Sequence, residues 1–367
     1  MKNIKYSIFA TAFLALCLTA CGNNQRLSYI SSQPVEPDNT VDVFVLSGQS
    51  NMEGSTYWKH PNGTPLLENY FEEEGMDYAP VSDGIGNVLT SYYGFYYPNG
   101  WSQAHTASID TSTPEARLTP NFQPTRVGMG VGDNNSGLFF GPELGIAHTL
   151  SEYASEDKPV HLIKCAFSGS GFEKTDGANW KTRPNEELSD SENASKSLYY
   201  LLRRYTDNCL KAIEDTGKEP IIRGFVWHQG ESDTGNSNYQ TQMEELIKDF
   251  REDYADYAED GDGKNIAFLD CTIYDGPKNR YGSQENVNNG INKLKNNIAA
   301  KGLLDESDKN FEKNYIVDGT FTEHGLSLEI GDDAKGGYNT YHYNTADAFK
   351  LGQAYGQIIL DKDLCAF

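Results

Sequence analysis

The sequence predicts an α/β protein in which helices cover both faces of a central parallel sheet. Short apolar runs alternate along the chain with longer segments whose apolar residues recur at helical spacing. The 367 residues, of which 38% are hydrophobic, suffice for a full core in one large domain. Because strands separated by helices are joined by crossovers, the alternation favours a parallel sheet over a meander.

Five apolar runs predict the strands of this sheet. The first stops at a small-residue turn with a serine at its tip, which is typical of a buried strand that delivers a nucleophile to the carboxyl edge of a sheet. The five runs are residues 41–46, 160–166, 220–227, 265–271 and 315–318.

Five segments between and after these runs predict helices. Pro142 lies in the first turn of one of them, and Gly217 follows the end of the next. The segment that follows the fourth strand has the weakest pattern. The predicted helices are residues 142–154, 198–213, 239–254, 291–300 and 346–360.

The N-terminal residues 1–20 have the pattern of a targeting signal. A basic start precedes an apolar run that is too short to span a membrane comfortably, and Cys21 follows its small-residue end. The pattern resembles a bacterial lipoprotein signal, which implies lipidation of Cys21. The alternative is an ordinary secretory signal, and both predict export. Residues 21–40, rich in Asn, Ser, Gln and Pro, then form a flexible tether.

A single domain is expected over residues 41–362, with a long loop insertion at about 53–141. The insertion has little periodicity, and loops of this length inside a domain are usually functional or disordered. Its aromatic segment 92–101 suits either a sugar-binding cleft or packing of the insertion onto the core.

Composition excludes several kinds of partner. A net charge of −23 leaves no basic surplus to neutralise the phosphates of a nucleic acid.

We expect no metal, because the cysteines form no zinc motif and the acidic turn 260–263 lacks the later ligands of a calcium loop. Two disulfides or buried free thiols are both open for Cys165, Cys209, Cys271 and Cys365.

The candidate catalytic residues follow strand ends or precede the last helix. Ser50 comes after the first strand, residues 228–233 after the third, and His342 just before the last helix. In a doubly wound sheet these positions converge on one crevice. A serine needs a base to become nucleophilic, and the base needs an acid to orient it, so the three segments hold the parts of a serine hydrolase.

These residues resemble a known family. The segments 48–52 (GQSNM), 227–231 (WHQGE) and 342–344 (HYN), with Gly352 downstream, are similar to motifs of the sialate acetylesterase-like carbohydrate esterases, a branch of the SGNH hydrolase superfamily. The segments 141–144 and 164–169 are similar to its intermediate motifs. The resemblance extends over roughly residues 41–360.

The resemblance implies a three-layer α/β/α sandwich with flavodoxin-like strand order, and removal of acetyl groups from carbohydrate without a cofactor. It implies Ser50 as nucleophile and His342 as general base. A serine that caps the following helix and a structural histidine are the alternatives.

The acid departs from the superfamily pattern. The position three residues before the histidine, which is commonly aspartate, is Asn339 and carries no charge. Glu231 is the preferred acid, and Asp318 and Asp333 are weaker candidates. The alternative for Glu231 is that it only orders its own loop.

Three donors are expected for the oxyanion: the backbone N–H groups of Ser50 and Gly169 and the side chain of Gln229. Gly171 competes with Gly169, and the loop could instead be a plain tight turn. For His228, two interpretations are open: it orients the Glu231 loop or contacts substrate, or it is a neutral histidine satisfied by backbone groups at a strand end.

The sequence therefore predicts a serine esterase that acts on acetylated carbohydrate outside the cytoplasm and meets a membrane only through its lipid anchor. The alternatives are a surface glycan-binding lipoprotein whose site has decayed and an esterase for a different ester. The sequence indicates neither the sugar nor the oligomeric state.

Overall fold

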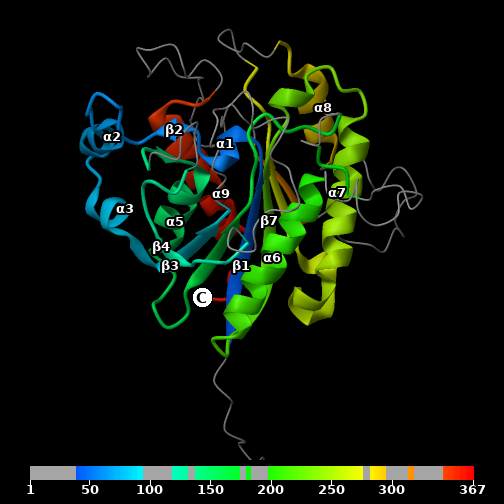
Figure 1. Cartoon of the computed structure of the whole chain (residues 1–367), viewed down its shortest axis with the longest axis horizontal. Coiled ribbons are helices and arrows are strands. Elements are labelled where there is room, and N and C mark those ends of the chain that lie inside the picture. Colours follow the sequence, from blue (N-terminus) through cyan, green and yellow to red (C-terminus); the bar gives the residue numbers. More distant parts are fainter. Residues whose placement is uncertain are drawn as a thin grey trace, which may run out of the picture. The chain divides into compact units, whose positions relative to one another are not determined.

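A seven-stranded sheet forms the centre of the structure, a computed structural model that describes residues 39–93, 118–130, 137–173, 179–182, 197–275, 282–294, 313–317 and 342–367. The strand order is β4-β3-β6-β1-β7-β8-β9. Figure 1 labels β1, β3, β4 and β7 of this sheet. The strands are β1 (Thr40–Gly48), β3 (Ile85–Tyr92), β4 (Gln123–Thr125), β6 (Val160–Lys164), β7 (Glu219–His228), β8 (Ala267–Cys271) and β9 (Asn314–Val317).

The five predicted strands are confirmed as β1, β6, β7, β8 and β9, and all their pairings are parallel. Taken in chain order, they have the arrangement 2-1-3-4-5, which is the flavodoxin-like order. The predicted fold class, an α/β/α sandwich, is therefore confirmed.

The described parts of the insertion at 53–141 contain strands and helices that the sequence did not predict. It contributes β3, which is parallel to β6, and β4, which is antiparallel to β3. It also holds the helices α2 (Leu66–Glu74) and α3 (Ala79–Asp83). The sequence pattern missed β3 because Gly86 and Asn87, both poor strand formers, interrupt it.

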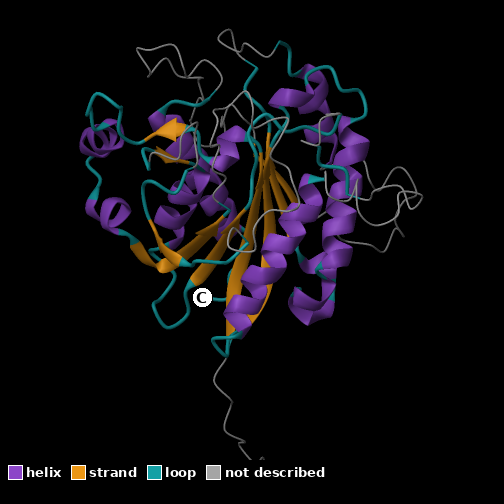
Figure 2. Ribbon diagram, in the orientation of Figure 1, coloured by secondary structure: helices purple, strands orange, loops and turns teal. Residues whose placement is uncertain are grey.

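Helices cover both faces of the sheet (Figure 2). Val41, Val43 and Val45 of β1 pack in one core cluster with α6 (Leu198–Glu214), α7 (Tyr239–Asp253) and α8 (Glu285–Leu294). Phe44 and Leu46, which point to the opposite face, pack with α5 (Pro142–Leu150) and α9 (Thr345–Asp361). Because both faces are covered, β1 has the nearly continuous apolar run of a buried parallel strand.

Four of the predicted helices are confirmed with slightly shifted ends, as α5, α6, α7 and α9. The fifth, 291–300, overlaps α8 over its first four residues, and residues 295–300 lie outside the described part of the chain. The largest shift is in α8, which begins at Glu285, six residues before the predicted start. Helices α5 and α9 approach closely at Gly145 and Gly352, which is possible because glycine has no Cβ. A Cβ on Gly145 would lie 2.1 Å from the Phe349 carbonyl oxygen. A Cβ on Gly352 would lie 2.2 Å from the Pro142 oxygen. This contact holds the middle of α9 against α5.

Of the two alternatives for the four cysteines, the structure has free thiols, three of them buried. Among the described residues, no helix has both the length and the apolar character needed to cross a membrane.

Candidate active site

The nucleophile candidate Ser50 lies at the turn between β1 and the short helix α1 (Ser50–Glu53). Gly48 makes the turn possible, since its φ is +144° and a Cβ would lie 2.0 Å from the His228 carbonyl oxygen. Ser50 is the first helical residue rather than the cap, and no side chain caps this helix. The hydroxyl forms no hydrogen bond with the described part of the chain, so it is not used as a structural cap.

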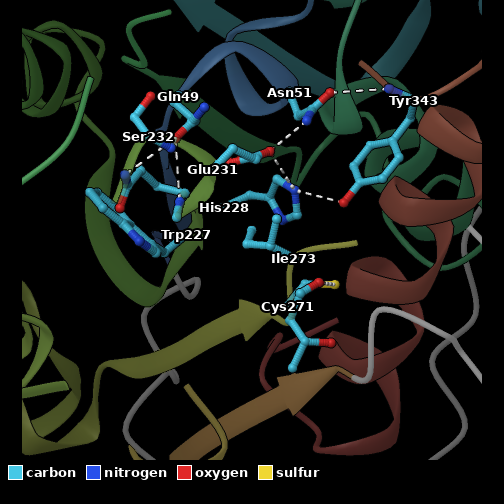
Figure 3. A network of polar contacts seen from close by, with 12 residues as sticks. Gln49, Asn51, Trp227, His228, Glu231, Ser232, Cys271, Ile273 and Tyr343 are labelled. Atoms are coloured by element: carbon cyan, nitrogen blue, oxygen red, sulfur yellow. Dashed lines mark hydrogen bonds and ion pairs between the residues drawn. The ribbon is translucent and has the colours of Figure 1, made fainter. Parts of the chain in front are cut away.

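The end of β7 lies directly beside this turn. Gly48 pairs with His228 in the sheet, and the Gln49 N–H donates to the His228 carbonyl at 3.0 Å. The Gln49 side-chain oxygen accepts from the Gly230 N–H at 3.3 Å and the Ser232 N–H at 3.2 Å (Figure 3). The loop after β7 is thus fixed to the residue that precedes the nucleophile.

The segment that carries His342 reaches the same turn from the far end of the chain. The Tyr343 N–H donates to Asn51 Oδ1 at 3.3 Å, and the Tyr343 carbonyl accepts from the Thr56 hydroxyl at 3.0 Å. Ser50 and His342 are therefore each one residue away from the same hydrogen bond. This contact places the two segments that carry the predicted nucleophile and the predicted base beside each other.

His342 has the protonation state that a general base needs. The residue as a whole is partly exposed, and its ring forms no hydrogen bond with a described residue. The imidazole itself is removed from water, and this desolvation lowers the pKa of His342 to about 4. The imidazole is therefore neutral at pH 7 and able to accept a proton.

Glu231 is held by the residue next to the nucleophile. Its Oε1 accepts from Asn51 Nδ2 at 2.6 Å (Figure 3), and burial raises the pKa of the carboxyl to about 7. Among the described residues, no hydrogen bond or ion pair joins Glu231 to His342. Glu231 is thus linked to the His342 segment through Asn51 rather than directly.

His228 lies in the core rather than at an open surface. The ring is fully buried, and burial lowers its pKa to about 3, so it is neutral. The hydroxyls of Tyr343 and Tyr355 lie 3.3 Å from Nε2 and 3.4 Å from Nδ1. The ring is therefore neutral, as the second alternative predicts, but among the described residues its partners are tyrosine hydroxyls rather than backbone groups.

Two of the three expected oxyanion donors have free hydrogens. Among described residues, the N–H groups of Ser50 and Gly169 donate to no protein group. The Gln229 side-chain nitrogen lies near three acceptors: Asp233 Oδ2 at 2.7 Å, and Gln49 Oε1 and the Ser170 carbonyl at 3.2 Å. Because an amide has only two such hydrogens, this placement does not favour Gln229 as an oxyanion donor.

The loop that carries Gly169 is held by carboxylates that sequence reasoning did not single out. Glu53 Oε2 accepts from the backbone N–H of Ser168 at 3.1 Å and from its hydroxyl. Asp233 accepts from the Phe172 N–H at 3.0 Å. Glu53 follows the GQSN motif and Asp233 follows HQGE, so proximity to the motifs was the only available signal.

A buried ion pair lies beneath the turn. Lys164 Nζ lies 3.0 Å from Glu143 Oε2, and both side chains are buried. The same ammonium donates to the carbonyls of Glu53, at 3.1 Å, and Met129, at 2.7 Å. It therefore connects the end of α1 to β6 and α5. Each of the motifs at 141–144 and 164–169 contains one partner, but nothing in the sequence indicated that these two residues form an ion pair.

Replacing Glu143 with glutamine is expected to destabilise the protein by about 3–5 kcal/mol, because it leaves the Lys164 ammonium buried without its counter-ion. Urea unfolding measures the loss. The control is Asp215→Asn, which breaks the exposed Lys211–Asp215 pair (2.8 Å) and should leave the midpoint unchanged. Equal midpoints for Glu143→Gln and the unaltered protein would show that the buried pair is not stabilising.

Several predicted residues lie outside the described part of the chain. They are Cys21, the acids Asp318 and Asp333, Asn339, and residues 94–101 of the aromatic segment. Of that segment, Tyr92 and Tyr93 are described. Tyr92 is partly buried, and Tyr93 is buried against the rings of Phe167 and Tyr205, as the packing alternative predicts. The described residues contain no group of three or more His, Cys, Asp or Glu side chains that could hold a metal ion.

Comparison with solved structures finds similar chains. The chain is similar to NanS, with a TM-score of 0.50 and 15% identity over 89% of this chain and 98% of the other. It is also similar to a protein of Arabidopsis thaliana, with a TM-score of 0.49 and 17% identity over 89% and 99% of the two chains. A carbohydrate acetylesterase from Xanthomonas citri matches with a TM-score of 0.44 and 15% identity, over 87% of this chain and 55% of the other.

No curated protein sequence matches the chain. A family description does match, over residues 40–311, a range that includes Ser50 and Glu231 and ends before His342. Because this range is more than half of the chain, the protein belongs to the family described as carbohydrate esterase, sialic acid-specific acetylesterase.

Proposed function

We propose that the protein is a serine esterase that removes O-acetyl groups from carbohydrate through an acetyl-enzyme, with Ser50 as nucleophile and His342 as general base. Its family is one of carbohydrate acetylesterases, which supports the reaction and the substrate class. The single observation that carries the residue assignment is the Tyr343–Asn51 hydrogen bond, which joins the two segments that hold Ser50 and His342.

The first half of the cycle transfers the acetyl group to the enzyme. Neutral His342 takes the Ser50 proton as Oγ attacks the ester carbonyl, and the N–H groups of Ser50 and Gly169 stabilise the oxyanion. The tetrahedral intermediate then collapses. The bond between the carbonyl carbon and the sugar oxygen breaks, and His342 gives its proton to that oxygen.

The second half regenerates the enzyme with water. His342 takes a proton from water, whose oxygen attacks the acetyl carbonyl, and the bond to Ser50 Oγ breaks. The proton returns to Ser50, and acetate leaves. Glu231, held by Asn51, supplies the negative charge that favours the imidazolium in both halves.

Acetate release across a panel of acetylated substrates tests this proposal. Acetylated xylan, acetylated pectin, an O-acetylated sialic acid and simple acetylated sugars are compared with a lipid ester. Turnover of at least one acetylated carbohydrate, above that of the lipid ester, is the expected result. Turnover of the lipid ester alone, or of nothing in the panel, would contradict it.

We further propose that the chain is exported and anchored to the bacterial cell envelope through a lipid on Cys21, as its N-terminal pattern supports. Changing Cys21 to serine should move the protein from the membrane fraction to the soluble fraction. An unchanged distribution would contradict the anchor.

A further inference from the structure

The hydrogen bonds around His228 fix where its proton lies. The Tyr355 hydroxyl lies 2.8 Å from the Trp227 carbonyl oxygen, which only accepts, so the tyrosine donates its single hydrogen there. Toward His228 Nδ1, at 3.4 Å, the same hydroxyl therefore accepts. Nδ1 must carry the proton of the neutral ring.

The tautomer determines what Tyr343 does. With its hydrogen on Nδ1, the neutral ring of His228 presents a lone pair at Nε2. The Tyr343 hydroxyl, 3.3 Å away, donates to it (Figure 3). Glu231 Oε1 lies 3.8 Å from the same nitrogen, beyond hydrogen-bond distance, and accepts from Asn51 instead. Tyr343 is thus the hydrogen-bond donor to Nε2 among the described residues.

Tyr343 is therefore held at three points by three different segments. Its N–H is bound to Asn51, its carbonyl to Thr56 and its hydroxyl to His228 at the end of β7. The side chain is 1% exposed, so water does not compete for the hydroxyl. All three contacts act on the residue that directly follows His342.

Building on the proposed function, we infer that Tyr343 is a positioning residue for the general base: anchored on the Nδ1-protonated tautomer of His228, it holds the His342 backbone at the nucleophile turn. The imidazole of His342 forms no hydrogen bond of its own with a described residue. Because His342 directly precedes Tyr343, the bonds of Tyr343 also fix the backbone that carries this imidazole, and a small displacement of a reacting group is enough to slow the reaction.

Tyr343→Phe tests the inference, because it removes only the hydroxyl. We expect kcat for acetate release to fall by about 10-fold or more while KM stays within about twofold, since substrate binding is not touched. The rate at which a fluorophosphonate inactivates the enzyme should fall by the same factor, because that reaction needs the same Ser50–His342 geometry.

Tyr205→Phe is the matched control. It removes the hydroxyl of another tyrosine that is 1% exposed, and this hydroxyl is bound to Ser91 Oγ at 2.8 Å, between α6 and β3, outside the network around His228. This variant should keep kcat within about twofold even if it is as destabilised as Tyr343→Phe. Equal losses of kcat in the two variants, or a change confined to KM, would overturn the inference.

A third variant keeps the test decisive if Tyr343→Phe does not fold. Thr56→Val removes the hydroxyl that binds the Tyr343 carbonyl, and it should likewise lower kcat without raising KM. Failure of the proposed function would look different. In that case the unaltered protein releases no acetate, or its Ser50→Ala variant still does. If only this inference fails, turnover depends on Ser50, and neither Tyr343→Phe nor Thr56→Val lowers it.

Discussion

Replacing Ser50 with alanine should lower kcat for acetate release by about 10⁴-fold or more, because the acetyl-enzyme can no longer form. The fold should be unaffected. The Ser50 hydroxyl forms no hydrogen bond with the described residues, and its removal leaves no buried group without a partner. Acetate release and thermal unfolding, measured on the same preparation, separate the two effects.

Ser47→Ala provides a serine control on the same strand. The Ser47 hydroxyl is buried and donates to the Cys165 carbonyl at 2.7 Å, so its loss should destabilise the protein by about 1 kcal/mol. Its effect on kcat should be small, since it lies within β1 and before the turn. If Ser50→Ala retained turnover similar to that of Ser47→Ala, Ser50 would not be the nucleophile.

Replacing Glu231 with glutamine is expected to change both the rate and its pH dependence. In the unaltered enzyme, activity should rise with pH through about 7, where Glu231 ionises, because His342 is already neutral above pH about 4. In Glu231→Gln the acidic limb should move down to about pH 4, and the plateau of kcat should fall by about 10²–10⁴-fold.

The free energy of unfolding should also change with pH as Glu231 ionises. The folded pKa of Glu231, about 7, lies above the ordinary value of 4.5, so the folded state holds a proton that the unfolded state loses between these values. The stabilisation is complete below pH 4.5 and is lost as pH rises through 7, a difference of about 3 kcal/mol. The Glu231→Gln variant should lack this decrease in the free energy of unfolding.

Asp233→Asn is the control for both measurements. Asp233 is a buried carboxyl in the same loop and burial also raises its pKa, but it binds the Phe172 N–H and the Gln229 side chain rather than Asn51. Its replacement should leave the limb near pH 7 in place. If the limb disappeared in Asp233→Asn and persisted in Glu231→Gln, the group that titrates near pH 7 would be Asp233 and not Glu231, which would contradict our assignment.

The sequence predicted the five parallel strands and their helices because the hydrophobic pattern of each element lies within that element. Each of the five strands is a compact apolar run, and each helix has its own apolar face, so no long-range information was needed. Strand β3 was missed because Gly86 and Asn87 weaken its pattern, and β4 has only three residues with a proline in the middle.

The site was predicted only in part, because its contacts join distant residues. Motifs placed Ser50, Glu231 and His342 at converging ends, but the bond between Asn51 and Tyr343 spans 292 positions and has no local signal. Gln229 shows the opposite problem. Its residue type suits an oxyanion donor, whereas the acceptors that occupy its nitrogen come from three different segments and are visible only in the structure.

Labelling with a fluorophosphonate, followed by peptide mass spectrometry, tests most directly whether Ser50 and His342 work as one site. The account predicts one label per chain, on Ser50, and labelling slower by about 100-fold or more in His342→Ala, because the serine then lacks its base. An unlabelled protein, a label on another residue, or equally fast labelling of Ser50 in His342→Ala would contradict it.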